Sequence, residues 1–129
     1  MIHGDIGAGR LIPLPLLGEG VARLASLILA IANAENGVVL VDEIENGVHY
    51  SIMGRVWEAI KEAVRRFNVQ LFATTHSREC IEAAHAAFSK DEKYDFRFHR
   101  LERVRDSIKV KSYDQEALSA AIQVGLEVR

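Results

Sequence analysis

Two adjacent carboxylates, Asp42 and Glu43, directly follow an apolar run at residues 38–41. Removing a carboxylate from water is costly unless a cation or a hydrogen-bond donor compensates it. Mg²⁺ is one such cation because it prefers oxygen ligands, and a neighbouring carboxylate can then position a water for attack on a phosphoryl group. Taken alone, a helix cap or a solvated loop explains such a pair about equally well.

A histidine, His76, follows the next apolar run, at residues 69–73, among three hydroxyl side chains (Thr74, Thr75 and Ser77). A lone histidine after a strand is more often a structural hydrogen-bonding group than a ligand contact. Because ligands of open α/β sheets bind at the carboxyl ends of the strands, this position instead favours a contact with a phosphate oxygen.

The tripeptide Gly18-Glu19-Gly20 stands before a long apolar segment. Backbone N–H groups at a helix start, left accessible by glycines, form an anion site. A flexible helix start without a ligand is the alternative, and Glu19 opposes anion binding unless its side chain points away from the anion.

The spacing of apolar residues predicts the elements that position these motifs. We expect a hairpin or extended arm over residues 1–17, with an edge strand at 11–17. Four helices are expected at 20–33, 51–67, 77–88 and 114–124. Parallel strands are expected at 38–41 and 69–73, and a hairpin of strands at 94–103 and 107–113 has its turn near 105–106. Ser51, Ser77 and Asp114 are candidate helix caps. We expect the helix at 20–33 to be covered on most sides, and the strand at 38–41 to be buried on both faces. The fold class is therefore α/β, in a single domain over 1–129.

The composition excludes several classes of protein. The chain is 49% hydrophobic and 26% charged, which excludes disorder, and its net charge of −2 gives no overall attraction to nucleic acid or an anionic membrane. The one cysteine excludes an intrachain disulfide. No signal peptide is recognisable, and the apolar stretch at 24–32 is too short to span a bilayer, so we expect a cytoplasmic protein with no membrane partner.

A small basic excess lies toward the C-terminus. Residues 90–111 hold eight Lys or Arg against five Asp or Glu. A solvated hairpin face explains this excess best. DNA binding is the weaker alternative.

Together, the motifs resemble the C-terminal half of an ABC-type ATPase, in the branch of predicted AAA/ABC-like ATPases that includes OLD nucleases, RecF and SMC proteins. Residues 17–21 (LGEGV) stand where that family has its signature motif, and residues 38–46 (VVLVDEIEN) resemble its Walker B strand and glutamate. Residues 47–49 resemble its D-loop, and residues 75–77 resemble its switch-histidine motif. The similarity covers about residues 14–80 well.

The resemblance implies a partial P-loop NTPase fold and roles for six residues. Asp42 would hold Mg²⁺ through its water shell, Glu43 would be the catalytic base or would position the water, and His76 would sense the γ-phosphate of ATP. Gly18, Glu19 and Gly20 would contact the ATP held by a second subunit, which implies a homodimer. The motif departs from the transporter signature, because no serine precedes Gly18 and Glu19 intervenes between the glycines.

The 129 residues contain no Walker A loop, GxxxxGK[ST]. Residues 4–11 mimic its spacing, but Arg10 and Leu11 replace the lysine and the hydroxyl, and we interpret this segment as a hairpin turn. We therefore expect the Walker A lobe to be missing, because the chain is a fragment, because its gene is truncated, or because another chain supplies that lobe. We also expect no ATPase activity from this chain alone.

Two other functions remain open at this stage. One is a non-catalytic dimerisation or regulatory module that kept the fold, with the apolar helix at 20–33 as its partner-facing surface. The other is a metal-dependent nuclease using Asp42, Glu43 and Glu45. It is less favoured because no further acidic cluster follows a neighbouring strand.

Overall fold

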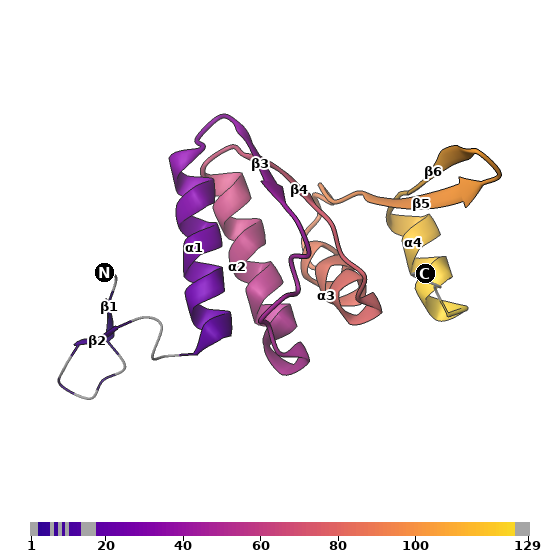
Figure 1. Ribbon diagram of the computed structural model, residues 1–129. Coiled ribbons are helices and arrows are strands. Elements are labelled where there is room, and N and C mark those ends of the chain that lie inside the picture. The colour runs from indigo at the N-terminus through magenta and orange to yellow at the C-terminus, as the bar shows by residue number, and fades with distance from the viewer. Residues whose placement is uncertain (1–2, 6, 8, 10, 14–17, 126–129) are drawn as a thin grey trace.

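The computed structural model describes residues 3–5, 7, 9, 11–13 and 18–125. In chain order its elements are β1 (His3–Asp5), β2 (Leu11–Pro13), α1 (Glu19–Asn33), β3 (Val38–Val41), the 3-10 helix η2 (Tyr50–Ile52), α2 (Met53–Arg66), β4 (Gln70–Ala73), α3 (Arg78–Phe88), β5 (Phe98–Val104), β6 (Ser107–Tyr113) and α4 (Gln115–Gln123) (Figure 1). This mixture of a parallel strand pair, helices and a hairpin confirms the predicted α/β class. The antiparallel pairing of β1 with β2 agrees with the predicted N-terminal hairpin. Residues 14–17 of the predicted edge strand lie outside the described residues.

The strands β3 and β4 pair in parallel, with Val38 opposite Gln70 and Val41 opposite Ala73. Backbone hydrogen bonds continue past the carboxyl end of this ladder: Thr74 N–H donates to the carbonyl of Val41 (2.9 Å), and Ile44 N–H donates to the carbonyl of Thr74 (3.0 Å). The two strands therefore end at the same level. The residue after Val41, Asp42, therefore lies beside the residue after Ala73, Thr74.

The main core lies between this strand pair and helices α1, α2 and α3. In α2, the buried residues Val56, Ile60 and Ala63 recur at the three- to four-residue spacing of one helix face. Ile31 of α1 and Cys80 of α3 are fully buried against the same cluster. In Figure 1, α1 and α2 run side by side.

Two predictions about burial are wrong. The strand at 38–41 is not buried on both faces: Val39 and Val41 pack on the core, whereas Val38 (55% exposed) and Leu40 (76% exposed) face outward, as does Phe72 of β4 (51% exposed). Side chains alternate along a strand, and only one face of the pair is covered by the helices of the described residues. Helix α1 is likewise covered on one side only, so that only its Ile31 is fully buried and both Val21 and Leu29 are exposed.

A second, smaller cluster joins the C-terminal hairpin to the body. Ile81 of α3, Tyr113 of β6 and Leu118 of α4 are its buried members. Beyond this base, Leu101 of β5 and Val110 of β6 are opposite one another and exposed. The predicted first strand of the hairpin starts at Phe98 rather than at residue 94, since the residues before it are held by the body: Tyr94 and Phe96 pack against the main core.

Two of the three predicted helix caps are confirmed. The Ser77 hydroxyl accepts from Cys80 N–H (3.1 Å), and the Asp114 carboxylate accepts from Ala117 N–H (2.9 Å). The cap predicted at Ser51 is wrong. His49 Nδ1 accepts from Ser51 N–H (3.3 Å) and caps η2, which leads directly into α2.

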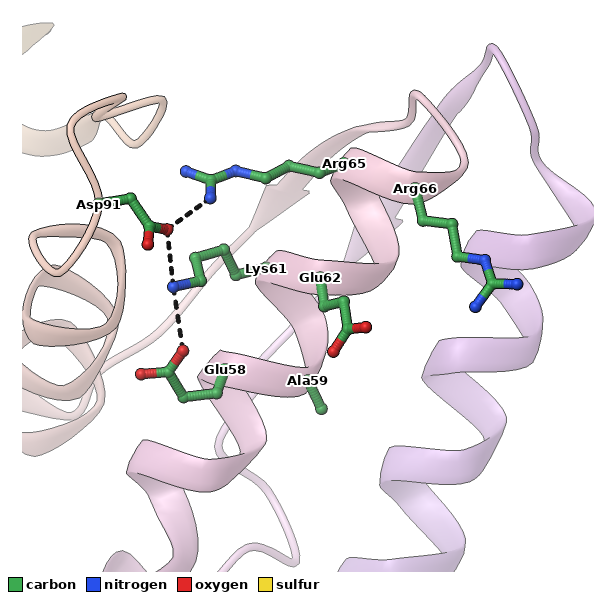
Figure 2. Close-up of a pocket in the computed structure, with 7 residues that line it drawn as sticks. All are labelled: Glu58, Ala59, Lys61, Glu62, Arg65, Arg66 and Asp91. Carbon is green, nitrogen blue, oxygen red and sulfur yellow. Dashed lines mark hydrogen bonds and ion pairs between the residues drawn. The ribbon is translucent and has the colours of Figure 1, made fainter.

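An ion-pair network fastens α2 to the segment after α3 (Figure 2). Asp91 pairs with both Lys61 (2.9 Å) and Arg65 (2.5 Å), and Arg65 also pairs with Asp95 (2.6 Å). These hydrogen bonds hold the pKa of Asp91 below its ordinary value. The charged groups of this network compensate one another, so we assign the network a structural role.

Among residues 18–125, no helix combines the length and the apolar composition that a membrane span requires.

Candidate functional site

Asp42 and Thr74 meet at the carboxyl end of the strand pair. Asp42 follows the last residue of β3, Thr74 follows the last residue of β4, and the Thr74 hydroxyl donates to Asp42 Oδ1. The level strand ends described above bring the two side chains together. The carboxylate of Asp42 is therefore fixed in direction while the residue stays exposed to solvent.

Glu43 has an unusual backbone conformation. Its φ is +47°, in the left-handed region that residues with a Cβ avoid. Its N–H donates to the Thr74 hydroxyl (2.8 Å), and its carboxylate Oε2 accepts from Asn46 Nδ2 (2.6 Å). Thr74 thus contacts both carboxylate residues, and Asn46 holds the carboxylate of Glu43. Strained conformations of this kind are concentrated at functional sites.

His76 lies at the same edge, next to Glu45. The N–H of His76 donates to Glu45 Oε1 (2.9 Å), whereas Glu45 Oε2 is buried without a hydrogen-bond partner among the described residues. Burial raises the pKa of Glu45, but hydrogen bonds from two backbone N–H groups and the Thr75 hydroxyl, with the nearby His76 ring, outweigh it and hold that pKa below its ordinary value. The acidic turn and the histidine segment are therefore directly linked, and His76 itself is exposed.

The glycine-rich start of α1 packs against the same turn. A Cβ on Gly20 would lie 2.8 Å from the carbonyl oxygen of Gly47, and Glu19 lies beside Gly47, whose φ is +74°. Gly18 is the N-cap of α1, with no side-chain hydrogen bond to the cap. Gly20 thus has a packing role within its own chain. Leu17, the first residue of the predicted signature motif, lies outside the described residues.

Arg23 also belongs to this site and is absent from the sequence predictions. Its Nη2 atom donates to the carbonyl oxygens of Asp42 (3.3 Å) and Glu43 (2.8 Å). A signal was present in the sequence, because Arg23 is the one charged residue between Gly20 and Asn33 of an otherwise apolar helix.

The site offers oxygen donors to a metal ion. The Asp42 carboxylate and the Thr74 hydroxyl are hard ligands, as Mg²⁺ requires, and Mg²⁺ commonly takes only one or two protein carboxylates beside phosphate and water oxygens. Among the described residues, no group of three or more His, Cys, Asp or Glu side chains could enclose a metal by itself. The donors fit an ion that is shared with a phosphate ligand and do not fit an ion held by this chain alone.

A hollow of about 400 Å³ borders the site. It is lined by Glu45, Val48, Tyr50, Met53, Ser77 and Glu79, and so lies between the acidic turn and the start of α3. Its walls are mixed, with acidic and hydroxyl groups beside apolar ones. It lies next to the candidate site, but Asp42, Glu43 and His76 are not among the residues that line it.

Comparisons with known proteins cover much of the chain. The family model described as "AAA domain, putative AbiEii toxin, Type IV TA system" matches residues 1–82. An ATP/GTP phosphatase of Helicobacter pylori is 31% identical over 74 residues, which are 55% of this chain and 20% of that protein. An uncharacterized protein of Methanocaldococcus jannaschii is 33% identical over 66 residues, which are 51% of this chain and 58% of that protein. The chain therefore spans less than two thirds of either relative.

A solved structure is similar over almost the whole chain. It comes from work on the structural biochemistry of ATP-driven dimerization and DNA-stimulated activation of SMC ATPases. The match has a TM-score of 0.60 and 17% sequence identity, and covers 95% of this chain and 70% of that one. At this identity the similarity establishes the fold, which is that of the SMC-type P-loop NTPases.

Proposed function

The chain belongs to the family of AAA domains whose model matches residues 1–82, and is thus an AAA/ABC-like ATPase family member. From this membership we propose that it contributes the Walker B and signature groups of an ATP-hydrolysing site. The observation that carries the proposal is the hydrogen-bonded junction of Asp42, Glu43 and Thr74 at the end of two parallel strands. Ligands of open α/β sheets bind at such an edge.

In this proposal each residue has a distinct task. Asp42, held by the Thr74 hydroxyl, would support Mg²⁺ through coordinated water, and Mg²⁺ bound with ATP would neutralise phosphate charge. Glu43 would accept a proton from the attacking water, and Asn46 orients its carboxylate. His76, exposed at the same edge, would donate to the terminal phosphate.

A complementary lobe would supply the Walker A loop. The exposed outer face of the strand pair supports this part of the proposal, because parallel sheets are ordinarily covered on both faces. Val38, Leu40 and Phe72 form that face and are each more than half exposed. A helix and further strands of the lobe would cover them, and would bring a phosphate-binding loop toward Asp42.

The start of α1 would act on a second nucleotide. Glu19 and Gly20 lie beside the acidic turn of their own chain, and the first N–H groups of α1, which follow Gly18, would face ATP held by a second copy. The proposed function therefore includes a dimer closed by ATP. DNA as a partner has no support beyond the small basic excess of the C-terminal hairpin.

Substitution of Glu43 tests the proposal. In the complete ATPase, formed with the Walker A-bearing lobe, we expect Glu43→Gln to lower ATP turnover by about 10²- to 10⁴-fold, the usual contribution of a positioned base, while ATP binding persists. Glu35→Gln, at an exposed position after α1, is the matched control and should turn over normally. The chain alone should show no turnover. Equal turnover by the Glu43→Gln and Glu35→Gln variants would refute the assignment.

A non-catalytic dimerisation module is the second candidate. The exposure of Val21 and Leu29 on α1 favours it, because these side chains offer an apolar contact surface. It predicts self-association, measured by analytical ultracentrifugation, that is independent of ATP and unchanged by Glu43→Gln. It also predicts that the complete assembly lacks turnover.

A further inference from the structure

Arg23 is placed where a single side chain can fix the backbone of both site carboxylates. It projects from the second turn of α1, and one nitrogen, Nη2, donates to the carbonyls of Asp42 (3.3 Å) and Glu43 (2.8 Å). Hydrogen bonds from a charged donor are about twice as strong as neutral ones. A guanidinium in an otherwise apolar stretch of helix therefore has a specific binding partner on the acidic turn.

The backbone that Arg23 contacts is the strained one. Glu43 has a φ of +47°. In a residue with a Cβ, this left-handed conformation is populated about tenfold less, or lower still, than the right-handed one. The Glu43 carbonyl also accepts from Asn46 N–H (3.0 Å), which closes the turn. Arg23 and Asn46 therefore hold the same carbonyl from two directions, and this carbonyl sets the direction of the peptide that carries the Glu43 side chain.

The same helix contacts the turn at a second place. Gly20 lies so close to Gly47 that a Cβ would be 2.8 Å from the Gly47 carbonyl oxygen, and the side chain of Glu19 also borders Gly47. The first turn of α1 thus touches the end of the 42–47 segment, and Arg23, one turn later, touches its beginning. A displacement of α1 along its axis would move both ends of the segment together.

We propose that Arg23 is a positioning residue that clamps the Asp42 and Glu43 carbonyls, sets the direction of the Glu43 carboxylate, and transmits movements of the glycine-rich start of α1 to it. The proposal deepens the proposed function and rests on it for the consequence for turnover. Its structural part, the clamp, can be tested without any ATPase activity.

The clamp is tested by hydrogen exchange of the chain itself. In Arg23→Met we expect amide exchange at residues 43–46 to be about tenfold faster, as loss of one charged hydrogen bond predicts, with Arg23→Lys in between. Arg55→Met makes the same change at an exposed position of α2 and should leave these amides unchanged. Unchanged exchange at 43–46 in a folded Arg23→Met protein would overturn the clamp. If Arg23→Met does not fold, faster exchange confined to 43–46 in Arg23→Lys is the required result, and its absence is equally decisive.

The coupling is tested in the complete ATPase. We expect Arg23→Met to lower kcat by about tenfold or more, with KM for ATP changed by less than about threefold, because an interaction that orients the base acts on the chemical step. Arg23→Lys should recover part of kcat, which a purely stabilising role would not predict. An unchanged kcat would overturn the coupling. If the wild-type assembly itself has no turnover, the proposed function fails, while the exchange result still decides the clamp.

Discussion

Substituting two glycines by alanine separates a packing constraint from ordinary helix propensity. Gly20 and Gly54 are each the second residue of their helices, α1 and α2. Alanine in a helix is favoured over glycine by up to about 1 kcal/mol. A Cβ on Gly54 would meet no atom within 4 Å, whereas a Cβ on Gly20 would lie 2.8 Å from the Gly47 carbonyl oxygen. The variants Gly20→Ala and Gly54→Ala therefore gain the same helix propensity, and they differ in whether the new Cβ meets this backbone contact.

The expected magnitudes follow from that contrast. Gly54→Ala should raise the free energy of unfolding by about 0.5 kcal/mol, since the start of a helix realises only part of the propensity difference. At Gly20 the contact is with backbone, which cannot rotate away, and forced overpacking costs about 1–3 kcal/mol. Gly20→Ala should therefore be destabilised by about 1–2 kcal/mol, which separates the two midpoints of thermal unfolding by roughly 5–10 °C for a chain of this size.

Thermal and urea unfolding followed by circular dichroism would measure both variants. The reasoning is refuted if Gly20→Ala is as stable as Gly54→Ala, because α1 would then not be seated on the turn that carries Gly47. In the complete ATPase, Gly20→Ala should also slow turnover, since a shift of α1 displaces Arg23 from the carbonyls of Asp42 and Glu43.

Two further predictions concern assembly and pH. Leu40→Lys should change the free energy of unfolding of the chain by less than about 0.5 kcal/mol, because Leu40 is 76% exposed. The same substitution should abolish co-purification with the Walker A-bearing lobe. Val124→Lys is the control, at a residue that is 87% exposed at the end of α4. Burial lowers the pKa of His85, whose ring bonds to Tyr94 and Ser119 (2.8 and 2.9 Å), so folding favours the neutral ring. Its contribution to stability is thus full above about pH 6.5, the unfolded value, and is lost as the pH falls through the folded pKa. In urea denaturation series, His85→Gln should flatten the decline of stability below about pH 6.5, and an unchanged slope would show that another group causes it.

Local sequence signals predicted the elements that position the site. The β-branched run before Asp42 and the apolar run before Thr74 form the predicted parallel pair, and Ser77 and Asp114 cap helices as expected. These features depend on side-chain periodicity and on short hydrogen bonds within a few residues, which a single sequence displays directly.

Long-range features could not be predicted in this way. The exposure of Val38 and Leu40 depends on which elements cover a face, and the same apolar run is compatible with a covered or an uncovered sheet. The role of Arg23 depends on a contact across about twenty residues of sequence, so its type could be noticed but its partner could not. The left-handed turn at Glu43 was also unexpected, because glutamate gives no local signal for that conformation.

The left-handed backbone at Glu43 is unfavourable for folding, whereas the proposed function requires a carboxylate at this position. Selection for thermal robustness alone would favour glycine or asparagine there, because both adopt a φ of +47° more easily than glutamate does. Neither offers a carboxylate. Under the proposed function, a lineage that lost hydrolysis and kept only the scaffold should drift toward those two residues, so the identity of residue 43 would indicate whether a related protein retains the proposed base.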